Sequence, residues 1–528
     1  MEVNCYPFEE TKTLQGFSLD YLSRSKSVTE LYSDFPDKEG FKKQIAKRLI
    51  KGCADRAVLS KALKAQYASI QSSASVQENI EALNQEKTFT IVTGHQLNLM
   101  TGPLYFVHKI HSAIRLAQQL KEWFPAYHFV PVYWMATEDH DFEEINHFYH
   151  RGKRTVWQSD EHGAVGRFST KELSHLLDHF ANEFSVGEAS DFVTLAKTAY
   201  ALPTLTQATR YIVNTLFGEH GLVCVDGDDK ALKRLVAPVF KQEMLQSVAS
   251  EQTVQSNKHI INLGYQPQLK IQEINLFYLK DQLRERIERE GENYRVRNTG
   301  ILFSQEELLQ ELKEHPERFS PNAALRPVYE EHILPNLAYI GGGAEVSYWL
   351  QLRSTFDALG VHYPAVVLRD SLVVLDTKHK QLRAKLNWSF SDCLGSLEGL
   401  EDKYIHQHKQ PTSSIKETRS TIEEAMDKVV EEIKALDSTL VASAQAARTK
   451  QLKALEVLEK KEKRAWRKKH QVELQQVRKL HAMIYPNGVF QERKMNIVDL
   501  IDDHGTQVLK DLFALSNPLD FRLKVVEL

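Results

Sequence analysis

With 528 residues, the chain is too long for one simple hydrophobic core, so we expect two or three domains. The composition is that of a globular protein, with 42% hydrophobic residues, 26% charged residues and a formal net charge of −3. This balance gives no sign of nucleic acid or an anionic membrane as a partner. No apolar run reaches the roughly 20 residues of a membrane helix, and the N-terminus does not resemble a secretion signal. The four cysteines show no CxxC spacing, so we expect neither a zinc site nor disulfides, and we predict a cytoplasmic protein.

Amphipathic helices are expected in the N-terminal region, residues 1–85, where apolar side chains recur at helical spacing. The stretch "TFTIVTGHQ" then predicts a buried strand that ends in a turn at Gly94. A helix follows in "TGPLYFVHKIHSAIRLAQQLKEWF", with Thr101 as a plausible N-cap and Pro103 in its first turn. The next strand is "YHFVPVYWMA". This order of strand, helix and strand is typical of a parallel, doubly wound α/β sheet.

The middle of the chain continues this pattern with an interruption. "GLVCVDGDD", residues 221–229, predicts another buried strand, and "NLFYLKDQLRERIEREGENYRVRNTGILFS" predicts a meander of strands inserted into the main sheet at about 250–340. Ser304 and Glu307 form a capping-box pattern. A glycine-rich turn, a helix and a strand then follow again. We therefore assign residues 86–375 to the α/β core.

The last third of the chain predicts a helical coiled-coil domain over residues 376–488, followed by a segment, 489–528, that returns to the core. Ile415, Ile422, Val429 and Leu436 recur every seven residues, which is a heptad seam. A second long helix is expected from about Thr439 to residue 484. The basic stretch 453–470 has glutamates interleaved, so we interpret it as the solvated face of this helix and not as a nucleic-acid site.

Two glycine-containing turns are candidate ligand sites because each follows a strand and precedes a helix, whose N-terminus attracts anions. Neither matches a standard nucleotide fingerprint. The first could bind an anion or nucleotide, or it could be a tight structural turn beside a solvated His-Lys pair. In the second, Glu345 could bind a cation or amine, or simply favour the helix dipole. The candidates in the first turn and its helix are Gly94, His95, Gln96, Thr101, Gly102, His108 and Lys109, and those in the second are Gly341, Gly342, Gly343 and Glu345.

The stretch "VPVYWMATEDHDFEEINHFYH" ends an apolar strand on Glu138, Asp139, His140 and Asp141, with Asn146 close behind. In open α/β sheets ligands bind beyond the carboxyl ends of the strands. Carboxylates crowded at such an end would raise one another's proton affinity and stabilise His140 as a cation. The cluster could then supply a general base or bind an amino group. The alternatives are a metal site, whose spacing is not diagnostic, and an acidic loop that caps the next helix.

Several stretches in this order resemble the bacillithiol biosynthesis cysteine-adding enzyme family. They are "TGHQ", "TGPLYFVHK", "EDHDFEEIN", "GYQPQL", "SPNAALRPVYEEHILPNLAYIGGGAEVSYWLQL", "LRDS" and "PNGVFQER". The resemblance runs from about residue 88 to the C-terminus. It implies a Rossmann-like core related to class I nucleotidyltransferases, with connecting insertions and a C-terminal α-helical coiled-coil domain that forms a homodimer. The resemblance also implies a relation of this core to aminoacyl-tRNA synthetases. The His-x-Gly-His and Lys-Met-Ser-Lys-Ser signatures of those synthetases are absent from the sequence.

The resemblance also implies a reaction, in which L-cysteine is joined to glucosaminyl-malate through an amide bond. Carboxyl activation by ATP, with ATP or ADP bound, is the expected driver, and no metal is predicted. Asp139 or Asp141 would hold the amine and His140 would move protons, while Lys109, Arg369 and His108 are candidates to bind the malate. Two alternatives stay open. One is another nucleotide-dependent amino-acid ligase on the same fold, and the other is a non-catalytic coiled-coil interaction protein.

Overall fold

The computed structural model describes residues 2–181, 187–408 and 415–528. The chain divides into two compact units. The core unit comprises Val3–Val373 and Val489–Val526, and the hairpin unit comprises Val374–Gly488 with the two chain ends. No helix among the described residues is long and apolar enough to cross a membrane.

The core unit is built on a sheet of five parallel strands in the order β13-β12-β2-β3-β6. Numbered along the chain, the sheet strands have the order 5-4-1-2-3, which is the arrangement around the switch point of a doubly wound Rossmann sheet. The predicted α/β class is therefore confirmed. The strands are β2 (Thr88–His95), β3 (His128–Met135), β6 (Val223–Asp226), β12 (Asn336–Gly341) and β13 (Ala365–Leu368).

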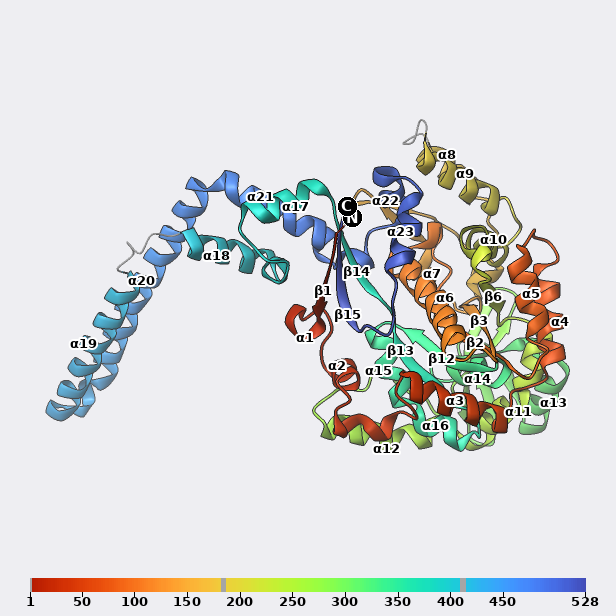
Figure 1. Cartoon of the computed structure of the whole chain (residues 1–528). Coiled ribbons are helices and arrows are strands. Elements are labelled where there is room, and N and C mark those ends of the chain that lie inside the picture. Colours follow the sequence, from red (N-terminus) through yellow and green to blue (C-terminus); the bar gives the residue numbers. More distant parts are fainter. Residues whose placement is uncertain (1, 182–186, 409–414) are drawn as a thin grey trace. The chain divides into compact units, whose positions relative to one another are not determined.

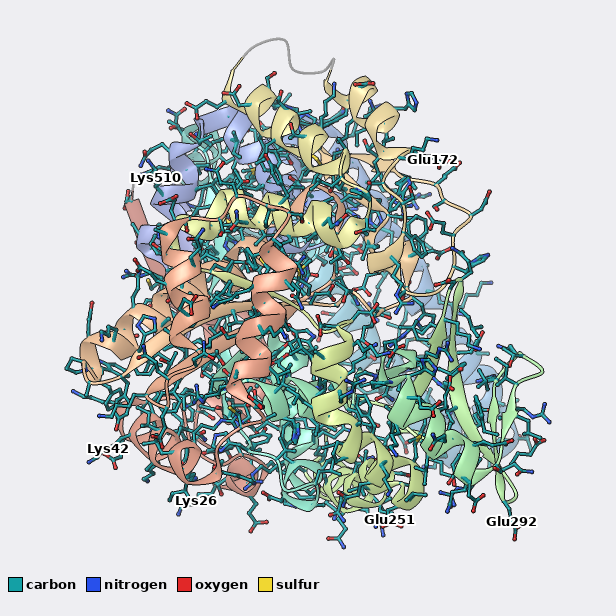
Figure 2. All side chains as sticks on the ribbon, turned by 90° about the vertical axis from the view of Figure 1, so that its right-hand side faces the viewer. Lys26, Lys42, Glu172, Glu251, Glu292 and Lys510 are labelled. Atoms are coloured by element: carbon teal, nitrogen blue, oxygen red, sulfur yellow. The ribbon has the colours of Figure 1, made fainter. Side chains whose placement is uncertain are left out.

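Helices cover both faces of this sheet (Figure 1). Successive side chains of each strand point to opposite faces, so both faces carry apolar side chains that must be buried. On one face, α3 (Lys38–Lys51) and α6 (Tyr105–Trp123) pack their apolar side chains against Phe89, Ile91 and Ile340. On the other face, Tyr339 of β12 stacks on Trp349 of α15 (Gly343–Gln351). Lys42 of α3 is exposed and points outward in Figure 2, so α3 is amphipathic as predicted.

The remaining helices of the core unit surround these elements. The first 85 residues are largely helical, as expected, but the chain opens with a strand, β1 (Glu2–Pro7), which lies in a sheet of order β1-β15-β14. The partner strands are β14 (Ser371–Leu375) and β15 (Arg522–Glu527). The longer helices are α4 (Arg56–Tyr67), α5 (Ala74–Ala82), α8 (Leu173–Ala181), α9 (Glu188–Tyr200), α10 (Leu205–Phe217), α11 (Lys230–Gln246), α12 (Val248–Asn262), α14 (Arg326–Ile333), α22 (Ile497–His504) and α23 (Gln507–Leu515).

The predicted strand meander is a separate antiparallel sheet of order β10-β9-β8-β7-β11. Its strands are β7 (Leu276–Lys280), β8 (Leu283–Glu290), β9 (Asn293–Val296), β10 (Leu302–Phe303) and β11 (Phe319–Pro321). Glu292 marks the tip of the β8–β9 hairpin in Figure 2. The capping box of Ser304 and Glu307 is confirmed at the start of α13 (Gln305–Glu314). This inserted sheet matters for function because β8 and β11 contribute side chains to the cavity described below.

One prediction about α6 is wrong, and one of the two alternatives for its His-Lys pair is excluded. Thr101 is not its N-cap: the helix starts at Tyr105 after Leu104, and Thr101 lies in a preceding 3₁₀ turn with a positive φ of 68°. His108 and Lys109 are not a solvated pair, because both are buried. The N-terminal half of α6 is covered on almost every side, so its polar residues from His108 to Ser112 lie inside the protein.

The hairpin unit contains the predicted pair of long helices. α19 (Ile415–Leu436) packs against α20 (Val441–Lys469), as a coiled-coil hairpin requires. The second long helix is interrupted at His470 and continues as α21 (Gln471–Ile484). Shorter helices complete the unit, namely α17 (Thr377–Lys385) and α18 (Leu397–His408). Several large apolar side chains of the hairpin are exposed, among them Val429, Leu436, Leu440, Val457 and Leu458.

Candidate functional site

The carboxyl ends of β2, β3 and β12 border a cavity of about 470 Å³ in the core unit. β2 and β12 are the two neighbours between which the strand order reverses. In doubly wound sheets this switch point is where ligands bind. The inserted sheet and the segment after residue 489 supply further walls of the cavity. The strand order and the cavity thus independently indicate the same place.

Most of the predicted site residues come together in this cavity, although they lie far apart in the sequence. Those that line it are Gly94, His95, Gln96, Lys109, Glu138, Asp139, His140, Gly342, Gly343, Glu345 and Arg369. The structure places the others outside its lining, namely Thr101, Gly102, His108, Asp141, Asn146 and Gly341.

A buried ion pair joins the two glycine turns at the switch point. Lys109 of α6 lies 2.5 Å from a carboxylate oxygen of Glu345 and donates to the carbonyl oxygen of Gly94 at 2.7 Å. Glu345 also accepts from the Tyr339 hydroxyl at 2.6 Å and from the backbone N–H of Gly342 at 2.9 Å, which completes a cap on α15. Burial alone would raise the pKa of Glu345, but Lys109 outweighs it and holds this pKa below its ordinary value. The carboxylate of Glu345 therefore interacts with groups of the protein itself.

A close contact explains the glycine in the first turn. A Cβ at Gly94 would stand 3.1 Å from the Tyr339 hydroxyl and 3.2 Å from a guanidinium nitrogen of Arg326. Arg326 is itself held by Glu330 at 2.8 Å and by the Tyr348 hydroxyl at 2.9 Å. A side chain at position 94 would therefore push against a fixed cation in the cavity wall.

A second buried ion pair lies beside the first. Both terminal nitrogens of Arg369 donate to the carboxylate of Glu492, at 2.7 and 2.9 Å, and Ser371 donates to the same carboxylate at 2.9 Å. The Nε of Arg369 is buried and has no hydrogen-bond partner among the described residues. The cation of Arg369 is thus neutralised within the protein, and its buried Nε makes no hydrogen bond to the described residues.

The last residue of β2, His95, presents a ring nitrogen without a hydrogen-bond partner among the described residues. The ring of His95 stacks on Phe106, with centroids 5.0 Å apart, and its Nε2 has no hydrogen-bond partner in the described part of the chain. Burial holds the pKa of His95 well below its ordinary value, and the nearby Lys109 and Arg369 lower it further. The ring is therefore neutral. His108 is also buried, and its Nε2 has no hydrogen-bond partner among the described residues. Its side chain does not line the cavity.

The loop after β3 presents Asp139 and His140 to the cavity. Gln96 donates to one oxygen of Asp139 at 2.6 Å, and the backbone N–H of His140 donates to the other at 2.8 Å. Arg284 of β8 lies 3.4 Å from that second oxygen and 2.6 Å from Nδ1 of His140. Burial raises the pKa of Asp139, but the charge of Arg284 and the hydrogen bonds from Gln96 and from the backbone N–H of His140 outweigh it and hold the pKa well below its usual range. Asp139 is therefore a carboxylate at neutral pH.

The other two carboxylates of this loop have structural contacts. Glu138 lies 2.7 Å from the fully buried Lys233, which also contacts Asp228 at 2.8 Å. Burial raises the pKa of Glu138 although Lys233 opposes the shift. Asp141 accepts from the backbone N–H of Glu144 and caps the short helix α7 (Phe142–Ile145). From the sequence we expect neighbouring carboxylates to raise the proton affinity of Asp139. Its pKa is lowered instead, because a cation and hydrogen-bond donors surround the carboxylate.

Sequence reasoning missed several arginines and tyrosines of the cavity. Arg284, Arg326, Tyr105, Tyr348 and Arg493 all line it. Arg326 and Arg493 lie in stretches that carried the family resemblance, which was the only signal for them. Arg284 lies in the inserted sheet, where alternating charged residues look like an ordinary solvated strand. Among the residues that the structure describes, no group of three or more His, Cys, Asp or Glu is placed to hold a metal ion.

Comparison with known protein families covers both parts of the chain. Residues 1–370 match the model described as "Bacillithiol biosynthesis BshC, N-terminal Rossmann-like domain", and residues 372–528 match "Bacillithiol biosynthesis BshC, C-terminal coiled-coil domain". The chain belongs to the BshC family. Both the suspected family and the predicted pairing of a Rossmann-like core with a coiled-coil domain are therefore confirmed.

Curated relatives cover the whole length of the chain. A protein of Flavobacterium johnsoniae is 39% identical over 534 residues, and one of Flavobacterium psychrophilum is 38% identical over 531 residues, each with 100% of both chains covered. A protein of Bacillus cereus is 28% identical over 513 residues, which cover 93% of this chain and 94% of the relative. All three relatives carry the name "Putative cysteine ligase BshC". The family assignment thus rests on the full length of the chain.

Proposed function

We propose that this BshC family member joins L-cysteine to glucosaminyl-malate through an amide bond, with ATP as the activating co-substrate. Family membership over the full chain and the names of the relatives support a cysteine ligase. The observation that carries the proposal is the switch-point cavity, where a carboxylate, two histidines and several arginines converge. Such a cavity suits small polar substrates that carry both amino and carboxylate groups.

The chemistry requires an activated carboxyl group, because a carboxylate does not react with an amine in water. In the proposed first step, a carboxylate oxygen of cysteine attacks the α-phosphorus of ATP and pyrophosphate leaves. The amine of glucosaminyl-malate then attacks the acyl carbon, AMP leaves, and the amine nitrogen loses its extra proton. The residues present fit a polar co-substrate of this kind, since the cationic side chains of Arg326 and Arg493 line the cavity. Glu345 already accepts the N–H of Gly342, so cationic side chains are better suited than that N–H to contact phosphate.

Asp139 is the best candidate to hold an amino group. It stays ionised, it lines the cavity, and 32% of its side chain is exposed. A carboxylate offers about four lone-pair sites, and the contacts from Gln96, Arg284 and the His140 backbone leave room for a substrate ammonium. Asp141 is a weaker candidate because it caps α7 and does not line the cavity.

Arg493 is the best candidate to bind the malate carboxylates. Lys109 and Arg369 are neutralised by Glu345 and Glu492, so they offer little net charge to a dianion. Arg493 lines the cavity and is exposed, and within the described ranges its guanidinium makes no hydrogen bond or ion pair with the protein. A guanidinium of this kind matches a carboxylate with two parallel hydrogen bonds.

The test combines a cellular and a purified assay. Lysates of the host with and without the gene would be labelled for thiols and scanned by mass spectrometry for the cysteine–glucosamine–malate product. We expect this thiol to disappear without the gene and glucosaminyl-malate to accumulate. The purified protein would then be given cysteine, glucosaminyl-malate and ATP, and we expect one pyrophosphate for each product formed. Product with another amino acid but not with cysteine would overturn the substrate assignment, and product without ATP would overturn the activation step.

We also propose that the hairpin unit makes a homodimer. Its exposed apolar residues are typical of a helical face that packs on another helix, and Leu436 keeps 82% of its surface exposed. Light scattering would give the mass in solution, where we expect twice the 60.7 kDa of one chain. A variant with Val457 and Leu458 changed to aspartate should shift towards the single-chain mass. A monomeric wild-type protein would contradict the proposal.

A further inference from the structure

We propose that Arg284 holds His140 as a neutral ring with the proton on Nε2, so that His140 acts as a hydrogen-bond donor to the reacting acyl oxygen. Arg284 is then a positioning residue, supplied to the Rossmann-like site by the inserted sheet. The donor role rests on the proposed cysteine-joining reaction. The protonation pattern does not, since it follows from geometry alone.

Arg284 is held in place by contacts on every side. Its Nε donates to the Ser320 hydroxyl at 3.2 Å, and one terminal nitrogen donates to the carbonyl oxygen of Pro321 at 3.1 Å. Its guanidinium lies 4.0 Å from the ring centre of Phe277, and only 6% of the side chain is exposed. The remaining terminal nitrogen is therefore aimed in a fixed direction, towards the loop after β3.

That nitrogen meets Nδ1 of His140 at 2.6 Å. A guanidinium has only donors and does not lose its proton in proteins, so Arg284 must donate in this contact. Nδ1 must then accept through its lone pair, because two N–H groups cannot share so short a separation. A neutral imidazole carries one proton, which leaves it on Nε2.

Asp139 is the group that would favour the opposite tautomer. Its oxygen lies 3.3 Å from Nδ1 of His140, so it could accept a hydrogen bond from a protonated Nδ1 if Arg284 were absent. With Arg284 present, the shorter contact decides the arrangement, and Asp139 is satisfied by Gln96 and by the His140 backbone. The imidazole also contacts the ring of Phe277, 5.5 Å away between centroids, which carries no charge. Arg284 and Asp139 are therefore the two charged groups that select the tautomer.

The Nε2 side of His140 is available to a ligand. His140 lines the cavity, 48% of its side chain is exposed, and Nε2 makes no hydrogen bond to any residue that the structure describes. When the amine attacks the acyl carbon of activated cysteine, negative charge develops on the carbonyl oxygen. A fixed N–H aimed at that oxygen stabilises the transition state without any proton transfer. This role differs from the proton-moving role that the sequence suggested.

The tautomer can be measured directly. Protein labelled with ¹⁵N-histidine would be examined by long-range ¹H–¹⁵N correlation, and the His140 signals would be assigned by their loss in His140→Gln. We expect an unprotonated Nδ1 and a protonated Nε2. In Arg284→Met the pattern should reverse, because Nδ1–H then donates to Asp139. Arg295→Met is the matched control, since Arg295 lies on the neighbouring strand β9, pairs with Glu290 and stays outside the cavity lining, and it should leave the signals unchanged. A protonated Nδ1 in the wild-type protein would overturn the proposal.

The donor role has its own test in the ligase assay. His140→Gln keeps a side-chain N–H donor but no group that titrates near neutral pH, whereas His140→Ala has neither. We expect His140→Gln to retain at least about tenfold more kcat than His140→Ala, and Arg284→Met to lower kcat about 10- to 100-fold with little change in the KM for cysteine. Equal losses in His140→Gln and His140→Ala would overturn the donor role. If the wild-type protein did not join cysteine at all, the proposed function would fail while the tautomer measurement would still decide the geometry.

Discussion

The two sides of the cavity hold their charged groups in opposite ways. On the β2–β12 side, Lys109 is paired with Glu345 and Arg369 with Glu492, and the two cations keep only 4% and 6% of their side chains exposed. On the β3 side, Asp139 and His140 keep 32% and 48% exposed, although Arg284 fixes their positions. The charges on the β2–β12 side are therefore neutralised within the protein, whereas the β3 side offers a carboxylate and an imidazole to a ligand.

This difference shows why residue type alone does not identify a functional group. A buried charge costs several kcal/mol of desolvation unless a partner compensates for it. The charges of Lys109 and Arg369 are compensated by carboxylates of the protein. We therefore expect these two residues mainly to maintain the shape of the switch point. Asp139 receives its partners but remains open to the cavity, so its effect should fall on the reaction. The following substitutions separate stability from activity on the two sides.

The largest effect on stability is expected from Lys109→Met. The change leaves the buried Glu345 without its cation, which should cost about 3–5 kcal/mol of unfolding free energy. Urea unfolding followed by tryptophan fluorescence would measure it. The double variant Lys109→Met/Glu345→Gln removes both charges, so it should lose less than the sum of the two single variants. A loss below about 1 kcal/mol in the single variant would mean that the pair does not act as a buried unit.

On the β3 side, Asp139→Asn should affect activity more than stability. Asparagine keeps the size and can still accept from Gln96, but it has no charge to hold the substrate ammonium. We expect kcat/KM to fall about 100- to 1,000-fold, with a small change in the urea midpoint. Asp141→Asn is the comparison variant, because it changes a neighbouring carboxylate that caps α7 outside the cavity. If Asp141→Asn lost as much activity as Asp139→Asn, the cavity assignment of Asp139 would be wrong.

The sequence predicted the elements of the fold better than the environment of each residue. Strand, turn and helix patterns near Gly94 and Gly342 predicted the doubly wound sheet, because local periodicity reflects which faces are buried. The same patterns could not show that Lys109 is buried, since that depends on Glu345, which lies more than 200 residues further along the chain. Arg284 was missed for the same reason: nothing near it in sequence refers to His140. The individual roles of the site residues remain predictions.

A pH-dependent effect is expected from His108, which precedes Lys109 on the neutralised side. Burial lowers the pKa of His108 to about 4, so the folded protein keeps it neutral while the unfolded chain protonates it below about 6.5. The unfolded state thus binds more protons between these values, and stability should fall as the pH falls from 6.5 to 4. A shift of this size corresponds to about 3 kcal/mol.

His108→Gln would isolate this contribution, because glutamine does not titrate. Unfolding free energies of the wild-type protein and the variant would be compared at pH 7 and pH 4. We expect the advantage of the wild-type protein to shrink by about 3 kcal/mol between the two conditions. A difference that did not change with pH would mean that His108 is protonated in the folded protein or is not buried as described.

The smallest expected effect is that of Arg493→Gln, and it should appear only in substrate binding. Because this guanidinium has no hydrogen bond or ion pair within the described residues, its removal leaves no buried charge behind and should not change the unfolding midpoint. A charge-assisted hydrogen bond contributes about 1.5–3 kcal/mol, so the KM for glucosaminyl-malate should rise about 10- to 100-fold. The KM for cysteine should stay near the wild-type value. A rise for cysteine instead would place the amino acid carboxylate at Arg493, and the two substrates would then occupy the cavity in the reverse order.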